Sequence, residues 1–271
     1  PTIEAMNRIG IDFNAVGNHE FDEGKDELLR MQNGGNHPTD AYSGLGLDVD
    51  KRADKEFAGA KFKFLAANVV ETASGSTVFP AVGVKSFLGN KVAFIGMTLE
   101  GTPTIVSPSG IVGLSFKDEA DTVNAMIPTL QAQGIKSVVV LIHEGGVDTT
   151  NDKISDCTGI SGPIVDIVNR LDAEVDLVIS GHTHQAYNCL INNKAGQPVR
   201  VTSAGQYARN LSDIDMVIDT KTKDVVSLTA TNVSVPVPAT VNNTVPLNTS
   251  VQEIVDHYDA AAAEPAGRVI G

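Results

Sequence analysis

The chain has little positive charge, few cysteines and no long apolar run. Its 20 lysine and arginine residues stand against 33 aspartate and glutamate residues, a formal net charge of −13 at pH 7. A surface that follows nucleic-acid phosphates needs clustered basic residues, so this balance predicts no nucleic-acid surface. No apolar stretch approaches the roughly 20 residues of a membrane helix, and no signal segment opens the chain, so no membrane span is predicted. The 2 cysteines exclude a cysteine-rich zinc site.

Hydrophobic residues make up 42% of the 271 positions, enough for a substantial core. Helical and strand patterns alternate, which predicts an α/β fold with a mixed sheet. Residues 36–59 and 234–248 show no clear period and are expected to be a long loop and a connector. Helices are expected at residues 2–9, 23–33, 117–133, 163–171 and 250–263, the last with Ser250 as its N-cap. Strands are expected at residues 12–16, 62–67, 80–87, 91–96, 137–142, 175–180, 186–191, 199–203, 214–219 and 225–233.

Three short polar runs each follow an apolar, β-branched stretch. Each run begins just past the carboxyl end of a predicted strand, which is where open α/β sheets place their active sites. Four of the 6 histidines fall in these runs. We therefore interpret the runs as parts of one site. They are Gly17-Asn18-His19-Glu20-Phe21-Asp22, His143-Glu144-Gly145-Gly146 and Gly181-His182-Thr183-His184.

The residue types in these runs suit metal ions. Imidazole is the commonest ligand of borderline transition metals, and an asparagine oxygen is a neutral donor that leaves the ion strongly Lewis-acidic. Asn18, His143 and His182 are candidate ligands of one ion. His184, two residues past His182, is a candidate ligand of a second ion about 3.5–4 Å from the first. A lone histidine at a strand end is more often structural, but the three runs together predict a metal-dependent hydrolase.

His19 is not needed as a ligand in this scheme and is a candidate catalytic group. Asp22, three residues on, is placed to accept a hydrogen bond from the His19 ring and hold it protonated. The alternative is that Asp22 caps the helix that follows, and one carboxylate can do both. Other acidic residues, Asp48, Asp50 and Asp54, are interpreted as a solvated loop rather than a cation site.

The three runs, in this order, resemble the metal motifs of the calcineurin-like metallophosphoesterases, and within them the bacterial 5′-nucleotidase group. The resemblance also takes in residues 64–69, 91–98 and 203–207, so it covers about residues 1–233. It implies the four-layer α/β/β/α metallophosphatase sandwich with mixed sheets, and two divalent metal ions such as manganese or zinc.

The resemblance also implies a role for each site residue. Asn18, His143 and His182 would bind one ion and His184 the other. Asn18 and His19 would contact the substrate. His19 would stabilise the transferring phosphoryl group or protonate the leaving oxygen, with support from Asp22.

The chain departs from the family pattern at its beginning. Family members normally start with a strand carrying Asp-x-His and then a Gly-Asp run whose aspartate bridges the two ions, and neither run is present here. Residues 1–233 are therefore expected to be an amino-terminally truncated catalytic domain. Residues 234–271 are expected to be a connector and linker helix toward an absent carboxy-terminal nucleotide-specificity domain. The chain as it stands is expected to hold at most one ion well and to be impaired as an enzyme.

Cys157 and Cys189 flank residues 181–184. A disulfide between them would close a loop of about 33 residues and contribute roughly 3–4 kcal/mol. The alternative is two buried thiols in a cytosolic protein. The likeness to secreted bacterial nucleotidases favours the disulfide and a periplasmic, cell-surface or secreted location, because disulfides persist only in oxidising compartments.

These observations predict metal-dependent hydrolysis of nucleotide phosphate monoesters, with a nucleotide or related phosphate ester as the partner. A 2′,3′-cyclic-nucleotide phosphodiesterase/3′-nucleotidase or a nucleotide-sugar hydrolase is the alternative within enzymes, because the same core serves all three. The alternative from another class is a non-catalytic binding module with a degenerate site, which the intact histidines oppose. Base preference, sugar preference and oligomeric state are left open.

Overall fold

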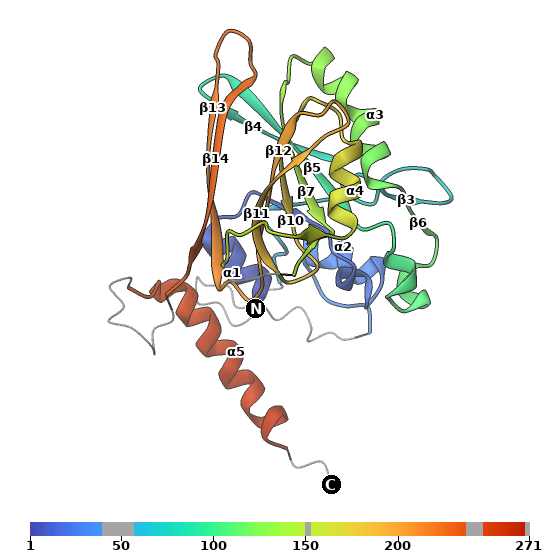
Figure 1. Ribbon diagram of the computed structural model, residues 1–271. Coiled ribbons are helices and arrows are strands. Elements are labelled where there is room, and N and C mark those ends of the chain that lie inside the picture. Colours follow the sequence, from blue (N-terminus) through green and yellow to red (C-terminus); the bar gives the residue numbers. More distant parts are fainter. Residues whose placement is uncertain (40–56, 150–152, 237–245, 269–271) are drawn as a thin grey trace.

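The computed structural model describes residues 1–39, 57–149, 153–236 and 246–268 (Figure 1). Its central sheet consists of β4 (Val82–Phe87), β5 (Asn90–Thr98), β7 (Ser137–His143), β10 (Val175–Ser180), β11 (Ala186–Asn192) and β12 (Pro198–Ala204). The six strands lie in the order β11-β12-β10-β7-β5-β4. The inner strands β5, β7, β10 and β12 are parallel to one another, and β4 and β11 are antiparallel to their neighbours. The predicted mixed sheet is confirmed.

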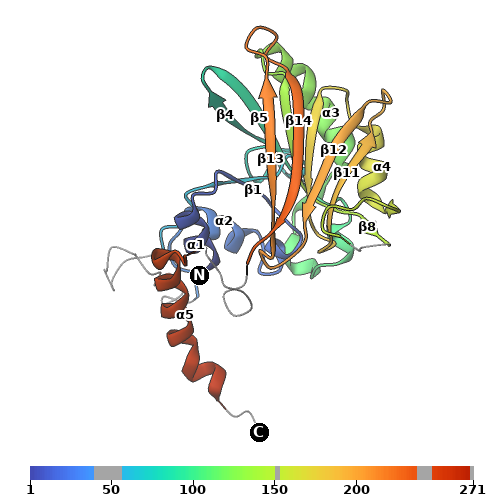
Figure 2. The ribbon, with the colours of Figure 1, turned by 60° about the vertical axis from the view of Figure 1, so that its left-hand side comes forward.

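The central strands are almost continuously apolar, and successive side chains point to opposite faces, so both faces of the sheet are buried. On one face, Val138, Val140 and Ile142 of β7 belong to the core covered by α3 (Glu119–Ala132) and α4 (Pro163–Arg170) (Figure 1). On the other face, Val139 packs with the apolar side of a second sheet, the hairpin of β13 (Asn210–Ile218) and β14 (Val225–Ser234) (Figure 2). Helices, mixed sheet and second sheet therefore form successive layers.

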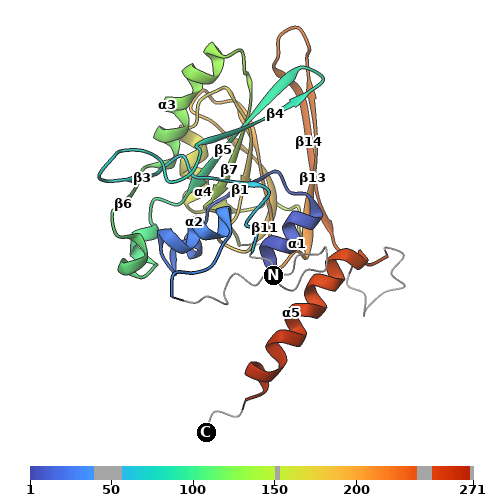
Figure 3. The ribbon, with the colours of Figure 1, turned by 180° about the vertical axis from the view of Figure 1, so that it is seen from behind.

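The first part of the chain forms a smaller unit beside the central sheet. It consists of α1 (Thr2–Ile9), β1 (Phe13–Ala15), the 3-10 turn η1 (His19–Phe21), α2 (Lys25–Asn33) and β2 (Lys63–Leu65). Strands β1 and β2 are parallel. Val16, Phe21, Leu28 and Phe64 are buried in a separate core there. Figure 3 shows α1 and α2 away from the turn of the β13–β14 hairpin, with α5 extending beyond them.

Several short elements have no clear sequence pattern and were not predicted. They are β3 (Val69–Glu71) paired with β6 (Leu114–Phe116), β8 (Val147–Asp148) paired with β9 (Ile160–Ser161), and the 3-10 turns η2 (Thr102–Thr104) and η3 (Pro108–Ile111). By contrast, the predicted β4–β5 hairpin is confirmed. Leu88 and Gly89 join its strands with φ angles of 51° and 84°, as a two-residue loop with a right-handed strand twist requires.

The last helix, α5 (Thr249–Gly267), begins one residue before its predicted start. The prediction that Ser250 is its N-cap is wrong. The Asn248 side chain accepts the backbone N–H groups of Ser250 and Val251 at 3.1 and 3.3 Å, which places the cap two residues earlier. Tyr258 of α5 donates a hydrogen bond to Glu4 of α1. In the described ranges, no helix combines the length and apolar character needed to cross a bilayer.

Cys157 and Cys189 form a disulfide with their Cα atoms 5.1 Å apart. The predicted pairing is confirmed, and the alternative of two free thiols is wrong. Cys189 lies on β11 with no exposed surface, and Cys157 packs against the same core. The bridge joins the segment before α4 to the strand that follows residues 181–184. The acidic residues Asp48, Asp50 and Asp54 lie outside the described residues.

Candidate metal and catalytic site

The three sequence runs meet beyond the carboxyl ends of neighbouring strands. Asn18 follows β1, His143 is the last residue of β7, and His182 and His184 follow β10. His143 Nε2 lies 3.0 Å from the side-chain oxygen of Asn18. The ring centroids of His143 and His182 are 5.2 Å apart. The structure therefore brings Asn18, His143 and His182 together, although they are far apart in the sequence.

Local backbone features allow this close approach. Gly17 precedes Asn18, and a Cβ atom at Gly17 would lie 2.8 Å from Cε1 of the His143 ring. Only glycine leaves room for that ring. The Gly17 N–H donates to the Glu20 carboxylate at 2.7 Å, which closes the turn around Asn18. Glu20 is thus a structural part of the first run.

The electrostatic environment keeps the central imidazoles neutral. Burial, together with the nearby His182, His19 and His184, lowers the pKa of His143 to about 4. Burial also lowers the pKa of His182, with a further contribution from His184. A neutral imidazole has the free lone pair that a metal ion needs.

The donor set fits a divalent transition metal. Two atoms that bind one ion at about 2.0–2.2 Å lie roughly 3–3.5 Å apart, which agrees with the 3.0 Å between His143 Nε2 and the Asn18 oxygen. Asn18 is only 1% exposed, so its amide oxygen is shielded from water. Neutral imidazoles with one amide oxygen suit zinc, manganese and related ions.

His184 lies apart from this central group. Its side chain is exposed, and its ring centroid is 6.4 Å from that of Tyr207. It nevertheless contributes to the lowered pKa values of both His143 and His182, so it lies near them. This position is compatible with a second ion beside the first.

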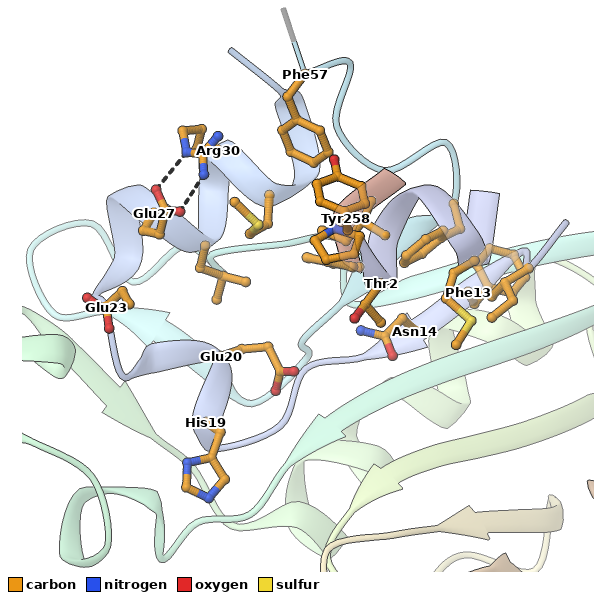
Figure 4. A pocket seen from close by; sticks show the side chains of 18 residues that line it. Thr2, Phe13, Asn14, His19, Glu20, Glu23, Glu27, Arg30, Phe57 and Tyr258 are labelled. Atoms are coloured by element: carbon orange, nitrogen blue, oxygen red, sulfur yellow. Dashed lines mark hydrogen bonds and ion pairs between the residues drawn. The ribbon is translucent and has the colours of Figure 1, made fainter. Parts of the chain in front are cut away.

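His19 contacts Asp22, as the sequence analysis predicts. Its Nδ1 lies 2.7 Å from the Asp22 carboxylate, and 76% of its side chain is exposed. The capping alternative is wrong, because α2 begins at Lys25 with Gly24 as its N-cap and no side-chain cap. His19 also lies at one edge of a cavity of about 790 Å³, whose other end is lined by Phe57 and Tyr258 (Figure 4).

Buried polar side chains also lie at the second run, and the motif analysis assigned them no role. Glu144 is 9% exposed, and burial raises the pKa of its carboxyl group. The Tyr187 hydroxyl accepts the Gly146 N–H at 3.1 Å and shares a hydrogen bond with Ser180 at 2.5 Å. Glu144 belongs to the second run, so the sequence gives a signal for it. Tyr187 has the sequence pattern of an ordinary strand residue, and only the fold brings it to Gly146.

A second group with metal-binding chemistry consists of Glu100, Asp118 and Glu119, whose carboxylate oxygens lie within 4.8 Å of one another. Two of these residues, Asp118 and Glu119, already have protein partners. Asp118 pairs with Arg170 at 2.7 Å, and Glu119 accepts the Glu100 N–H at 2.6 Å. Their spacing in the sequence gives no signal that would have identified them.

No protein-family model matches the chain, but related proteins are found by sequence. The chain is 32% identical over 271 residues to Endonuclease YhcR of Bacillus subtilis, across all of this chain and 20% of that protein. It is 26% identical over 187 residues to a 5′-nucleotidase of Vibrio cholerae, across 68% of this chain and 28% of that protein. The chain therefore spans less than a third of each of these relatives.

Solved structures show the same fold. A 5′-nucleotidase precursor from Thermus thermophilus matches all of this chain and 47% of its own with a TM-score of 0.71 at 21% identity. The calcineurin-like phosphoesterase YfkN of Bacillus subtilis matches 98% of this chain and 75% of its own with a TM-score of 0.69 at 20% identity. The predicted metallophosphatase fold is confirmed by these matches.

Proposed function

This chain belongs with the 5′-nucleotidases and calcineurin-like phosphoesterases, a hydrolase family, and from that premise we propose that it hydrolyses nucleotide phosphate monoesters with the help of divalent metal ions. The observation that carries the proposal is the meeting of Asn18, His143 and His182 beyond the ends of β1, β7 and β10. These three side chains come from distant segments and bring uncharged metal-ligand atoms together, which packing alone does not require.

We assign Asn18, His143 and His182 to one ion and His184 to a second. When bound, such ions supply Lewis acidity and offset the negative charge of a phosphoryl group. The lowered pKa values of His143 and His182 keep these residues ready as ligands at neutral pH. Asn18 would also present its amide group to a phosphoryl oxygen beside the ions.

His19 acts on the leaving group in this proposal. With its Nδ1 held by Asp22 at 2.7 Å, the ring is oriented so that Nε2 is free to face the substrate. The protonated ring then donates a proton to the ester oxygen as the bond from that oxygen to phosphorus breaks, while a water molecule attacks phosphorus from the opposite side. The proton that the water loses restores the charge of the ring for the next cycle. The Asp22 carboxylate holds the ring in this orientation during the transfer. The exposed position of His19 suits a group that must meet a substrate arriving from solvent.

We further propose that residues 1–233 form the catalytic domain and that residues 234–271 form a connector and linker helix. The end of β14 at Ser234 supports this boundary. The Cys157–Cys189 disulfide supports a location outside the cytoplasm, where such bonds persist.

A phosphodiester substrate is the second candidate, because Endonuclease YhcR, to which all 271 residues of this chain align, is named an endonuclease. The same ions and the same proton donor would serve that reaction. The two candidates differ in the group that must fit around the phosphorus atom, so a substrate panel separates them.

The test begins with the metal-free protein, titrated with manganese or zinc while phosphate release from adenosine monophosphate is followed. Parallel reactions contain 2′,3′-cyclic adenosine monophosphate and a short single-stranded oligonucleotide. We expect metal-dependent release from the monophosphate at a low rate, because the chain has no Asp-x-His or Gly-Asp run to complete a two-ion centre. His143→Ala should lower kcat/KM by roughly 100-fold or more, since even groups that only support a ligand are worth 10–100-fold.

His257→Ala is the matched control, because His257 lies exposed on α5. Its activity and metal affinity should equal those of the unchanged protein. Calorimetric metal titration gives a second readout, in which His143→Ala weakens binding and His257→Ala does not. Metal-independent hydrolysis, or equal metal affinity in both variants, would rule out the proposed site.

A further inference from the structure

The loop of residues 205–209, which joins β12 to β13, carries an exposed aromatic ring and an exposed guanidinium beside the candidate site. Tyr207 is 77% exposed, and its ring centroid is 6.4 Å from that of His184. The guanidinium carbon of Arg209 lies 5.5 Å from the centroid of the Tyr207 ring. The loop therefore presents an aromatic face at the same end of the sheet as the candidate metal ligands.

The backbone holds this ring in an unfavourable conformation. Tyr207 and Ala208 are consecutive non-glycine residues with φ angles of 57° and 51°, in the left-handed region. Side chains of L-residues disfavour this region because Cβ crowds the following carbonyl oxygen. The Asn210 side chain donates to the Ala204 carbonyl at 3.0 Å, which closes the loop at its base and maintains the conformation.

Burial of the Tyr207 ring does not compensate for this conformation. The Tyr207 ring is not buried, and in the described part of the chain its hydroxyl has no hydrogen-bond partner. Strained backbone of this kind concentrates at ligand sites, where it holds a contact group in position. The ring is held out toward solvent next to His184, and the ring contacts that it makes are those with His184 and Arg209.

Arg209 adds a positive charge to a strongly acidic chain of net charge −13. Within the residues that the structure places, its guanidinium forms no ion pair, and its contact is one face of the Tyr207 ring. A cation over an aromatic ring is attracted by the electron-rich face. Because the ring is mostly exposed, its second face remains accessible. The pair thus offers an aromatic surface and a charge that attracts anions.

We propose that Tyr207 and Arg209 form a nucleobase subsite within this chain. The base of a nucleotide whose phosphate lies beside Asn18 and His143 stacks on the accessible face of Tyr207, and Arg209 attracts the anionic substrate. This inference rests on the proposed function. Base–aromatic stacking changes affinity by about 5- to 150-fold and tolerates every base, because all bases have a π-face. The subsite therefore recognises the presence of a base rather than its identity.

The first experiment measures binding without turnover. The chain contains no tryptophan, so Tyr207→Trp introduces a single indole fluorophore at the subsite and keeps an aromatic surface. Adenosine, uridine and glycerol 2-phosphate are titrated against the metal-free protein. Quenching of the indole emission by both nucleosides, and not by glycerol 2-phosphate, supports the subsite. An emission that no nucleoside changes up to millimolar concentration overturns it.

The second experiment compares kinetics with two substrates. Tyr207→Ala should raise KM for adenosine monophosphate by about 10-fold and leave the KM for glycerol 2-phosphate and both kcat values within about twofold. Tyr207→Phe should retain the unchanged KM, because the ring and not the hydroxyl makes the contact. Arg209→Gln should raise KM for the nucleotide and reduce its dependence on salt.

Lys221→Ala is the matched control for a lost surface cation, because Lys221 is exposed at the turn of the β13–β14 hairpin, at the opposite end of β13 from Arg209. Its kinetics should be unchanged. If the protein hydrolyses both substrates and Tyr207→Ala affects them equally, the subsite is wrong and the proposed function stands. If nucleosides quench the indole emission but no phosphate ester is hydrolysed with any metal and His143→Ala binds metal as tightly as His257→Ala, the subsite stands and the proposed function is wrong.

Discussion

Removal of the Cys157–Cys189 disulfide should destabilise the protein strongly, and the loss can be calculated from the loop that it closes. The two cysteines are separated by 32 positions. In the chain-entropy model, closing a loop of this length raises the free energy of the unfolded state by about 4 kcal/mol. For a chain of this size each kcal/mol shifts Tm by roughly 2–4 °C, so the unbridged protein should melt roughly 10 °C lower.

The assay is equilibrium unfolding in urea and by heat, for the oxidised protein, for the protein with reductant and for three variants. Cys157→Ala, Cys189→Ala and the double variant should all lose a similar amount, because each one removes the same bridge. Alanine is chosen since Cys189 is fully buried and a serine hydroxyl would need a partner there. Cys189→Ala should lose slightly more than Cys157→Ala, because it also leaves a small cavity.

Two results would refute this reasoning. One is an oxidised protein in which a thiol reagent modifies both cysteines without unfolding, as measured by intact mass. The other is a midpoint that reductant does not change. The bridged loop contains α4, β10 and both histidines of the third run, so the reduced protein should also bind metal more weakly. Separate titrations of both forms below the melting temperature would measure that effect.

Two further predictions concern buried groups elsewhere. Burial, with added repulsion from nearby acidic residues, raises the pKa of Asp176 from 3.8 to about 7. Between these two values the folded state retains a proton that the unfolded chain releases. The free energy of unfolding therefore falls as pH rises from about 4 to about 7. Asp176→Asn keeps an acceptor for the Val138 N–H and should therefore be more stable than the unchanged protein at pH 8, by on the order of 2–4 kcal/mol, but not at pH 3.5, in urea unfolding at each pH. A Cβ atom at Gly110 would lie 2.0 Å from the Phe21 carbonyl oxygen, so Gly110→Ala should destabilise the fold by roughly 1–3 kcal/mol. Gly101→Ala is the control, because its Cβ would meet nothing closer than 3.9 Å, and it should not destabilise the fold. Equal melting temperatures for the two variants would contradict this prediction.

The sequence was sufficient to predict elements whose signals are local. Apolar, β-branched stretches identified β7 and β10. The polar residues after those strands identified His143 and His182 as neighbours before any distance was known. The parallel arrangement of strands converts a sequence pattern into a spatial one, because all carboxyl ends meet at one edge. That rule is the reason that residues more than a hundred positions apart could be grouped correctly.

The features that were missed depend on contacts between distant segments or on competing local choices. Strands β3 and β6 have three residues each, too few for a period to be visible. Asn248 and Ser250 are both good N-caps, and composition alone does not decide between them. Tyr187 carries no polar signal in the sequence, yet its hydroxyl binds the backbone of Gly146 because β11 folds back beside that turn. Tertiary contacts decided each of these cases.

Several residues of the candidate site have environments or backbone conformations that lower the stability of the fold. Burial disfavours the charged form of His143, and two neighbouring histidines, His182 and His184, hold left-handed backbone conformations at φ 67° and 60°. Each such residue costs about 1–2 kcal/mol. Tyr207 and Ala208 add the same kind of strain a short distance away. Glycine or asparagine at the left-handed positions would make the fold more stable. The clustering of these unfavourable residues around one space therefore supports a binding role for that space.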